Sequence, residues 1–315
     1  PSIGIAEIDL NLFDDIKRGI SVHGNYNFFD KDEPLNMKGK LNNLDLTIFQ
    51  PFLRNLITNL KGRTDADISI NGSLNNPKIS GLGRFFKSEF TVNYLNTLYR
   101  LDNQIALVEN NSIILQNFAI HDTRGQQAKA NGIINLSKVA NPYLDIDTYA
   151  DNLMILNTNF KDNNLYYGTA YATGNFKFKG YTSSIAIDID AKSESGTVIN
   201  IPFNSAMKVS DSDFIYFISK DSTENKKRER RTFFNGLTMN MDFNLTRDAE
   251  VNLQTNLGSL KGNGNGAISM KISSLGDFEM FGDYVINNGK FHFTAQDFIN
   301  KYFDIKEGGT VRWTG

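Results

Sequence analysis

Paired carboxylates are the residues of this chain whose type and spacing come closest to a catalytic pattern. Asp145 and Asp147, and again Asp188 and Asp190, stand two positions apart, so each pair lies on one face of a β-strand. Clustered carboxylates hydrolyse polysaccharides in some β-helical enzymes, and they also bind cations. The neighbouring residues are apolar, however, and this alternation favours aspartates that form the water-exposed face of a sheet.

The histidines and glycines give no stronger sign of catalysis. The three histidines, at positions 23, 121 and 292, are far apart and lack the spacing of metal ligands. The run Gly262-Asn-Gly-Asn-Gly266 lacks the Lys-Ser/Thr of a phosphate-binding loop and predicts a turn or bulge. No Gly-x-Ser-x-Gly or HExxH motif is present. We therefore expect no catalytic residues, no metal and no cofactor, so that the chain is not an enzyme.

Composition narrows the class of protein further. The formal net charge is −2, which gives no global field for nucleic acid, so we expect no nucleic-acid partner. Cysteine is absent, which excludes disulfides and thiolate metal sites. The chain holds 24 Phe, 12 Tyr and 25 Gly but 6 Pro, a balance typical of twisted β-sheet with tight turns. No apolar run reaches the ~18–20 residues of a membrane-spanning helix, and the chain starts without Met, so we interpret it as a fragment of a longer protein.

Alternation of apolar and polar residues dominates the chain and predicts an all-β fold, with antiparallel neighbours as the default for short connections. The alternating runs cover residues 3–5, 8–12, 20–28, 64–74, 86–94, 105–107, 113–120, 128–136, 144–155, 167–178, 185–191, 237–245, 251–257, 268–272, 278–286, 291–293 and 311–313.

Two segments depart from this pattern. Apolar residues at spacings of three and four predict one short amphipathic helix near residues 47–61, with Thr47 as its N-cap. This helix either plugs the end of an open sheet or lies on a membrane surface. Residues 219–231 contain no apolar residue and end in a densely basic stretch. This composition predicts a mobile charged loop at residues 219–232. A patch for phosphates or lipid headgroups is the alternative.

The apolar stripe of each strand must be covered by something. A second sheet would give a sandwich, the chain's own coils would give a closed β-helix, and a foreign apolar molecule would occupy an open groove. About 18 to 20 strands at ~4.8 Å each would make a sheet about 90 Å long, and ten residues span about 33 Å, enough to bend into a U. The sequence physics alone leaves the trough and the sandwich equally open.

The C-terminal motifs resemble a known family. The pattern Gly282-x-Tyr-x-Ile-x-x-Gly289-x-Phe-x-Phe293 is followed by Phe303-x-Ile-x-x-Gly308-Gly-x-Val-x-Trp313-x-Gly315, and together they resemble the C-terminal domain of the TamB family, the inner-membrane component of the translocation and assembly module. Further motifs, at residues 75–81, 94–99, 166–174 and 196–202, are similar to a Bacteroidetes-type member. The resemblance covers most of the chain.

The resemblance implies an AsmA-like bridge protein, anchored in the inner membrane by a segment outside this chain. Its fold would be an elongated, curled antiparallel sheet that forms a U-shaped hydrophobic trough, a β-taco. Residues 1–315 would be a single elongated domain in the periplasm, at the end nearest the outer membrane. The family is implicated in moving phospholipid toward the outer membrane. It is also implicated in assembling outer-membrane β-barrels with an Omp85-class partner, either TamA-like or BAM-like.

Two functions of different class follow, both associated with membranes. In the first, the chain is a non-enzymatic lipid conduit, and the residues that we expect to line its groove are Ile68, Ile70, Ile185, Ile187, Ile189, Leu237, Met239, Met241, Phe243, Ile268, Met270, Ile272, Phe291 and Phe293. In the second, it is a scaffold for barrel assembly or secretion that acts by strand addition, and the same residues are only its core. A third function, an adhesin or carbohydrate-binding β-helix, predicts outward aromatic platforms, which the alternation does not favour.

Overall fold

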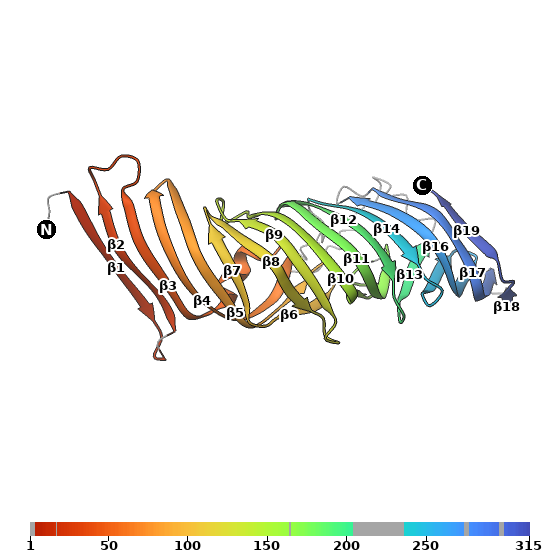
Figure 1. Cartoon of the computed structure of the whole chain (residues 1–315). Coiled ribbons are helices and arrows are strands. Elements are labelled where there is room, and N and C mark those ends of the chain that lie inside the picture. The colour runs from red at the N-terminus through yellow and green to blue at the C-terminus, as the bar shows by residue number, and fades with distance from the viewer. Residues whose placement is uncertain (1–3, 17, 164, 204–235, 274–276, 296–298) are drawn as a thin grey trace, which may run out of the picture.

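A computed structural model describes residues 4–16, 18–163, 165–203, 236–273, 277–295 and 299–315, and within them nineteen strands form one continuous sheet (Figure 1). The predicted loop at 219–232 lies outside these residues. The strands are β1 (Ile5–Phe13), β2 (Gly19–Asn27), β3 (Leu35–Asp45), β4 (Ile57–Ser73), β5 (Asn76–Val92), β6 (Thr97–Leu101), β7 (Gln104–Glu109), β8 (Ser112–His121), β9 (Gln127–Asn135), β10 (Tyr143–Thr158), β11 (Tyr167–Tyr181), β12 (Ser184–Ser193), β13 (Val198–Phe203), β14 (Leu237–Leu245), β15 (Glu250–Thr255), β16 (Gly258–Ser273), β17 (Phe278–Ala295), β18 (Ile299–Ile305) and β19 (Gly309–Thr314). The expected all-β, elongated and curled sheet is confirmed.

The strands follow one another along the sheet nearly in chain order (Figure 1). Most neighbours are antiparallel, and the long strands β5, β11 and β17 each pair with two short strands placed end to end. Two pairs, β12 with β14 and β13 with β15, are parallel, which the default of antiparallel neighbours did not predict. A parallel pair requires a long connection, and residues 204–235 separate β13 from β14.

Several strands escaped the sequence prediction, among them β3 and β13, together with the first half of β16. In β16 the reason is the glycine run, which we expected to form a turn or bulge. The strand continues through it with a register shift between Asn263 and Gly264. The close approach of β17 explains Gly264, because a Cβ there would lie 2.2 Å from the Val285 carbonyl oxygen and 2.8 Å from the Cζ atom of Tyr284. The Tyr284 hydroxyl donates a hydrogen bond to the Gly262 carbonyl at 3.0 Å.

The helical segment is present but shorter than the predicted range. A 3₁₀ turn (η1, Leu46–Phe49) leads into α1 (Gln50–Leu53), and β4 begins at Ile57. Asp45 rather than Thr47 is the N-cap, because its carboxylate accepts the Thr47 backbone N–H. Gln50 then fixes the start of β4: its Nε2 donates to the carbonyl of Ile57 at 2.8 Å, and its Oε1 accepts the N–H of Leu60 at 2.9 Å. The apolar spacing therefore continued into a strand.

Left-handed asparagines mark the places where the sheet bends. Asn43, Asn59, Asn117 and Asn152 have φ between 48° and 54°, and each lies at a register shift between neighbouring strands. Side chains of the adjacent strand accept the freed N–H groups, as Asp65 does from Asn43 at 2.6 Å and Asn131 from Asn117 at 2.7 Å. Asparagine tolerates this conformation better than most residues, and bulges increase twist and bend. These positions account for much of the curl.

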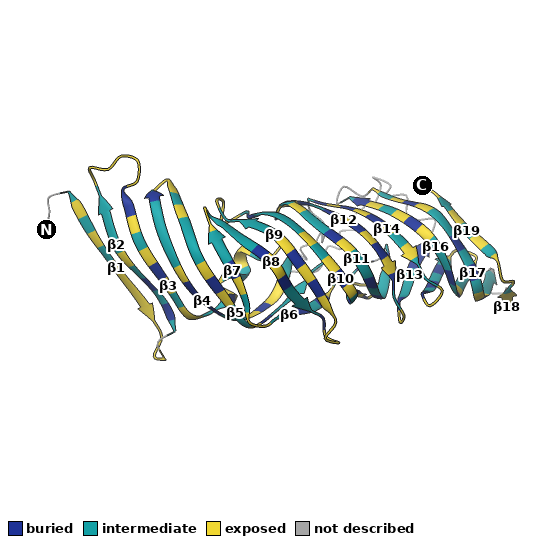
Figure 2. Cartoon of the chain, in the orientation of Figure 1, coloured by how far each residue is buried: buried dark blue, intermediate teal, exposed yellow. Residues whose placement is uncertain are grey.

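The buried core occupies only part of this long sheet. The larger cluster of buried apolar residues runs from Tyr99 to Ile286, whereas β1 contains no buried residue. A smaller cluster around Ala106, Phe118 and Ala130 lies beside it. Figure 2 shows the result as exposed and half-buried strands at the N-terminal end and more buried positions from β8 onward. The curled C-terminal part therefore encloses most of the buried interior.

Candidate apolar binding cavity

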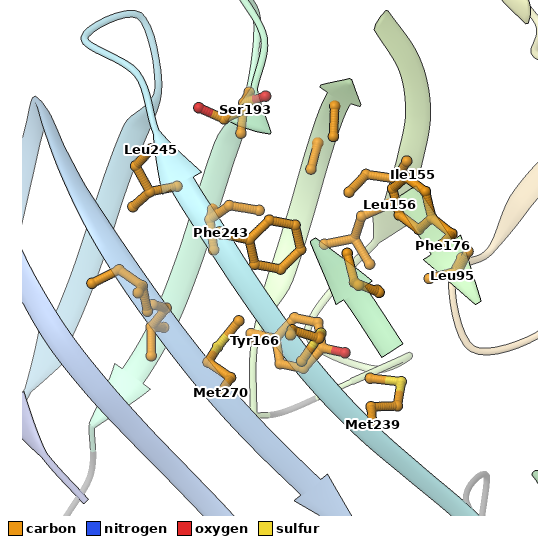
Figure 3. Close-up of a pocket in the computed structure, with 18 of the residues that line it drawn as sticks. Leu95, Ile155, Leu156, Tyr166, Phe176, Ser193, Met239, Phe243, Leu245 and Met270 are labelled. Atoms are coloured by element: carbon orange, nitrogen blue, oxygen red, sulfur yellow. The ribbon is translucent and has the colours of Figure 1, made fainter. Parts of the chain in front are cut away.

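An apolar cavity lies inside the curl, between strands that are far apart in the sequence. One wall comes from β10 and β11, the next from β12 and β14, and a further wall from β16, with Met280 of β17 and Trp313 of β19 beside them. Tyr94 and Leu95, in the turn between β5 and β6, and Tyr166, just before β11, also line the cavity, as do residues of β13 and β15. Figure 3 shows the labelled side chains converging on this space. The strands of the curled sheet therefore cover the cavity on most sides.

The chemistry of the cavity is that of hydrocarbon. Its lining contains no charged side chain, and its polar residues are tyrosine, serine and threonine. The serine and threonine hydroxyls are engaged: Ser193 Oγ pairs with Thr246 Oγ1 at 3.1 Å, and Thr197 Oγ1 donates to the carbonyl of Glu194 at 2.7 Å. The volume is about 100 Å³, several times the ~10–15 Å³ that holds one water molecule. Cavities lined in this way stay dry and take apolar guests.

The structure brings half of the expected lining residues together at the cavity. These seven are Ile187, Ile189, Met239, Met241, Phe243, Ile268 and Met270. They meet because register pairs Ile187 with Met239 and Met241 with Met270 across neighbouring strands. Three more, Ile185, Leu237 and Ile272, are buried in the same cluster but do not line the cavity.

The other four expected residues lie elsewhere on the sheet. Ile68 and Ile70 are half-buried on β4, outside the cavity lining. Phe291 and Phe293 are half-buried on β17, with ring centroids 6.3 Å apart. Asn287 is an extra residue in β17, because Gly264 pairs with Ile286 and Asn263 pairs with Asn288. After the bulge, Phe291 pairs with Leu260 and Phe293 with Gly258, so both phenylalanines remain on the face that carries Ile268 and Met270 but lie outside the cavity lining.

Several lining residues were missed by the sequence reasoning. Tyr94, Leu95 and Tyr166 reach the cavity from turns, which have no alternation to reveal them. Ile199 and Ile201 of β13 carry a short alternation that could have been found, since Pro202 hides only its end. Trp313 belongs to an alternating run on the last strand, β19, but was not among the predicted lining residues.

The paired aspartates form the water-exposed face of the sheet, as the alternation indicated. Lys179 approaches Asp145 at 3.2 Å, and Lys177 approaches Asp147 at 3.4 Å, from the neighbouring strand β11. On β12, Asp188 accepts a hydrogen bond from Asn240 of β14 at 2.8 Å. Among the described residues, no group of three or more His, Asp or Glu side chains is placed to hold a metal ion.

Two of the three histidines make side-chain contacts with a neighbouring strand. His23 lies 2.9 Å from an oxygen of Asp9 on the paired strand β1. The ring of His292 stacks on Tyr302, with centroids 4.3 Å apart, and its Nε2 is 2.7 Å from the Asn300 side-chain oxygen. These contacts connect neighbouring strands, so they have a clear structural role.

The fold and the cavity together define a class: an elongated β-sheet protein curled around an apolar interior. The family of the TamB C-terminal domain matches residues 116–315, which is more than half of the chain. The chain therefore belongs to the TamB family, and this membership indicates a role in outer-membrane assembly or biogenesis. No curated protein and no solved structure matches the chain significantly. The helical residues that the structure describes include no segment with the length and apolarity to cross a membrane.

Proposed function

We propose that this chain carries the acyl chains of phospholipids through its apolar interior, as a non-enzymatic bridge segment that serves the outer membrane. The cavity at the centre of the curled sheet carries the proposal, because its lining is apolar and without charge. Acyl chains would lie against the side chains of β12, β14 and β16, while the charged headgroup stays in water. No bond breaks in this process, so it needs no catalytic group.

Membership of the TamB family supports a cellular location for such a segment. A periplasmic location, at the outer-membrane end of a protein with an inner-membrane anchor, is compatible with TamB membership. There the apolar interior would shield acyl chains from water at about 25 cal/mol for each Å² of apolar surface covered. Movement along the interior would then exchange one apolar contact for another.

A second function, strand addition during barrel assembly or secretion, is favoured by the two ends of the sheet. Within the described residues, β1 pairs only with β2, and β18 and β19 pair only with β17. Apolar side chains are exposed on these edge strands: Leu12 is 58% exposed, and Tyr302 is 69% exposed. An open edge can pair with a strand of another protein. The proposed partner is an Omp85-class barrel, TamA-like or BAM-like.

A photocrosslinking experiment in cells tests the lipid proposal. Met241 and Asn240 are neighbours on β14, and Met241 faces the cavity while the Asn240 side chain is exposed. A photoactivatable residue at Met241 should capture phospholipid, which mass spectrometry of the purified protein would identify, whereas the same residue at Asn240 should not. Folded protein without captured lipid at either position would contradict the conduit.

A charged variant separates the two functions. Met241→Asp should abolish lipid capture if the chain is a conduit, and its effect on folding should differ between the two functions. If the interior is a lipid groove that water can enter, the variant keeps its β circular dichroism spectrum and a cooperative unfolding transition. If the interior is only a core, the unpaired charge should cost several kcal/mol and unfold the chain.

A further inference from the structure

Polar groups that lack partners lie in a corner beside the cavity, in segments that also supply the lining residues Tyr94, Leu95 and Tyr166. Six buried side-chain atoms of the described residues have no hydrogen-bond partner. Four of them surround the turn between β5 and β6 and the segment that follows β10: Asn93 Oδ1, Thr97 Oγ1, Thr158 Oγ1 and Asn163 Nδ2. A hydrogen bond of 2.9 Å from Asn157 N–H to the Leu95 carbonyl joins these segments. Unpaired buried polar atoms are uncommon, and a bound ligand is one of the reasons for them.

Two tyrosines connect this corner to the cavity. Tyr94 and Tyr166 both line it, and they are near enough for Tyr166 to influence the ionisation of Tyr94. Figure 3 shows Tyr166 among Phe243, Met270 and Met239, with its hydroxyl at the cavity. The described residues offer the Tyr94 hydroxyl no hydrogen bond. Asn163 interacts with the ring hydroxyl of Tyr166, but its Nδ2 atom has no partner at hydrogen-bond distance.

The two tyrosine hydroxyls and the Asn163 amide nitrogen can donate hydrogen bonds to a neutral acceptor. Burial raises the pKa of both tyrosines above the ordinary value of 10.0, so both hydroxyls keep their protons at neutral pH and can donate. The Asn163 side chain is 5% exposed, and its Oδ1 is already used by the N–H of Leu165 at 2.9 Å, which leaves the Nδ2 hydrogens to donate. No charged side chain lines the cavity, so an ionised carboxylate would have no counter-charge there.

We propose that the Tyr94 and Tyr166 hydroxyls and the Asn163 amide form a subsite for the ester carbonyl of an acyl chain whose hydrocarbon part fills the cavity. This inference rests on the proposed function and goes further, because it assigns a fixed binding position within the apolar interior. An ester is a neutral acceptor with no donor of its own, so it suits a site at which these three groups can donate. A pure hydrocarbon would leave them unpaired.

The single tryptophan of the chain provides the readout. Trp313 is the only tryptophan in the sequence and lines the cavity, so a brominated guest should quench its fluorescence. We would titrate the 315-residue chain with brominated methyl stearate, which has an ester, and with a brominated octadecane, which has none. The test variant is Tyr94→Phe with Tyr166→Phe, which removes the two hydroxyls and keeps the rings. The matched control is Tyr149→Phe, because Tyr149 is 52% exposed and is not part of the cavity lining.

The subsite predicts a selective loss of affinity. The double variant should bind the ester about tenfold more weakly, as expected for two lost hydrogen bonds, and should bind the hydrocarbon as the native chain does. Equal ester affinity for both proteins would overturn the subsite while leaving the conduit intact. An equal loss for ester and hydrocarbon would also overturn it, since packing would then be the cause. If neither guest quenches Trp313 in the native chain, the proposed function fails together with the subsite.

Discussion

The N-terminal strands and the curled C-terminal part use the same β-strand pattern with different results. On β1, Leu10 and Leu12 are 45% and 58% exposed, although they alternate with polar residues. On β12 and β14, Ile187 and Met239 are 1% exposed. Alternation therefore marks a face of the sheet, but only the curl decides whether that face is buried. The apolar face becomes an interior where bulges and turns bring distant strands together.

The largest effect should come from Tyr284, which is fully buried against the glycines of β16. Tyr284→Ala removes its ring and the hydrogen bond to Gly262, and should lower the free energy of unfolding by about 3–5 kcal/mol. Chemical denaturation measures this change. Tyr302→Ala is the control on β18, where a 69% exposed ring should contribute about 0.5 kcal/mol or less. Similar losses for both variants would show that burial does not distinguish the two positions.

Leucine substitutions compare the two regions directly. Leu253 on β15 is 5% exposed, and Leu12 on β1 is 58% exposed. Leu253→Ala should lower the free energy of unfolding by about 2–5 kcal/mol, and Leu12→Ala by about 0.5 kcal/mol or less. Thermal and urea unfolding of both variants would check this. A large loss for Leu12→Ala would mean that the apolar face of β1 is buried in solution.

Substitutions of the asparagines at the bulges should change the free energy of unfolding equally in both regions. Asn43 and Asn117 have φ of 48° and 49°, one in the open part and one beside the smaller core cluster. Replacing either by Ala should cost about 1–2 kcal/mol, because the left-handed conformation is strained for residues with a Cβ. Replacing either by Gly should cost less, since glycine adopts this conformation without that strain. Unequal alanine penalties, measured by denaturation, would show that packing rather than backbone strain sets the cost.

The smallest effect concerns the pairing of the last strand. Arg312 on β19 donates to both carboxylate oxygens of Asp283 on β17, at 2.6 and 3.1 Å, and these hydrogen bonds hold the pKa of Asp283 below its ordinary value of 3.8. Its contribution is therefore complete above about pH 4 and is lost as the pH falls through the lower, folded-state value. The exposed position keeps this contribution small.

The fluorescence of Trp313 should follow this acid transition because it is next to Arg312. In Asp283→Asn the same signal should change less between pH 5 and pH 2. An unchanged acid profile in the variant would indicate that other carboxylates govern the pairing of β19.

Much of the cavity could be predicted from the sequence where the phase of a strand is unbroken. Ile187 and Met241 lie on strands whose inward positions alternate without a bulge, so simple parity places them correctly. Phe291 lies on the same face, opposite Leu260 of β16, but outside the cavity lining, because parity gives the face of a residue and not its distance from the cavity. Tyr166 reaches the interior from a turn, which only the folded curl brings to the cavity. Short-range patterns thus predict faces, while the meeting of faces depends on long-range geometry.

The predicted helix also shows the limit of short-range patterns. Apolar residues spaced by three and four continued past Leu53, yet the chain turns into β4 at Ile57. The side chain of Gln50 holds two backbone groups of that strand, and these tertiary contacts override the helical periodicity.

Native mass spectrometry of the 315-residue chain, purified from cells without detergent, tests the central claim most directly. The claim predicts a bound species with the mass of a phospholipid, and it predicts that the folded Met241→Asp variant loses this species while the folded Asn240→Asp variant keeps it. A native chain that is folded and free of lipid, or lipid that is retained equally by both variants, would contradict the claim that the curled C-terminal interior holds acyl chains.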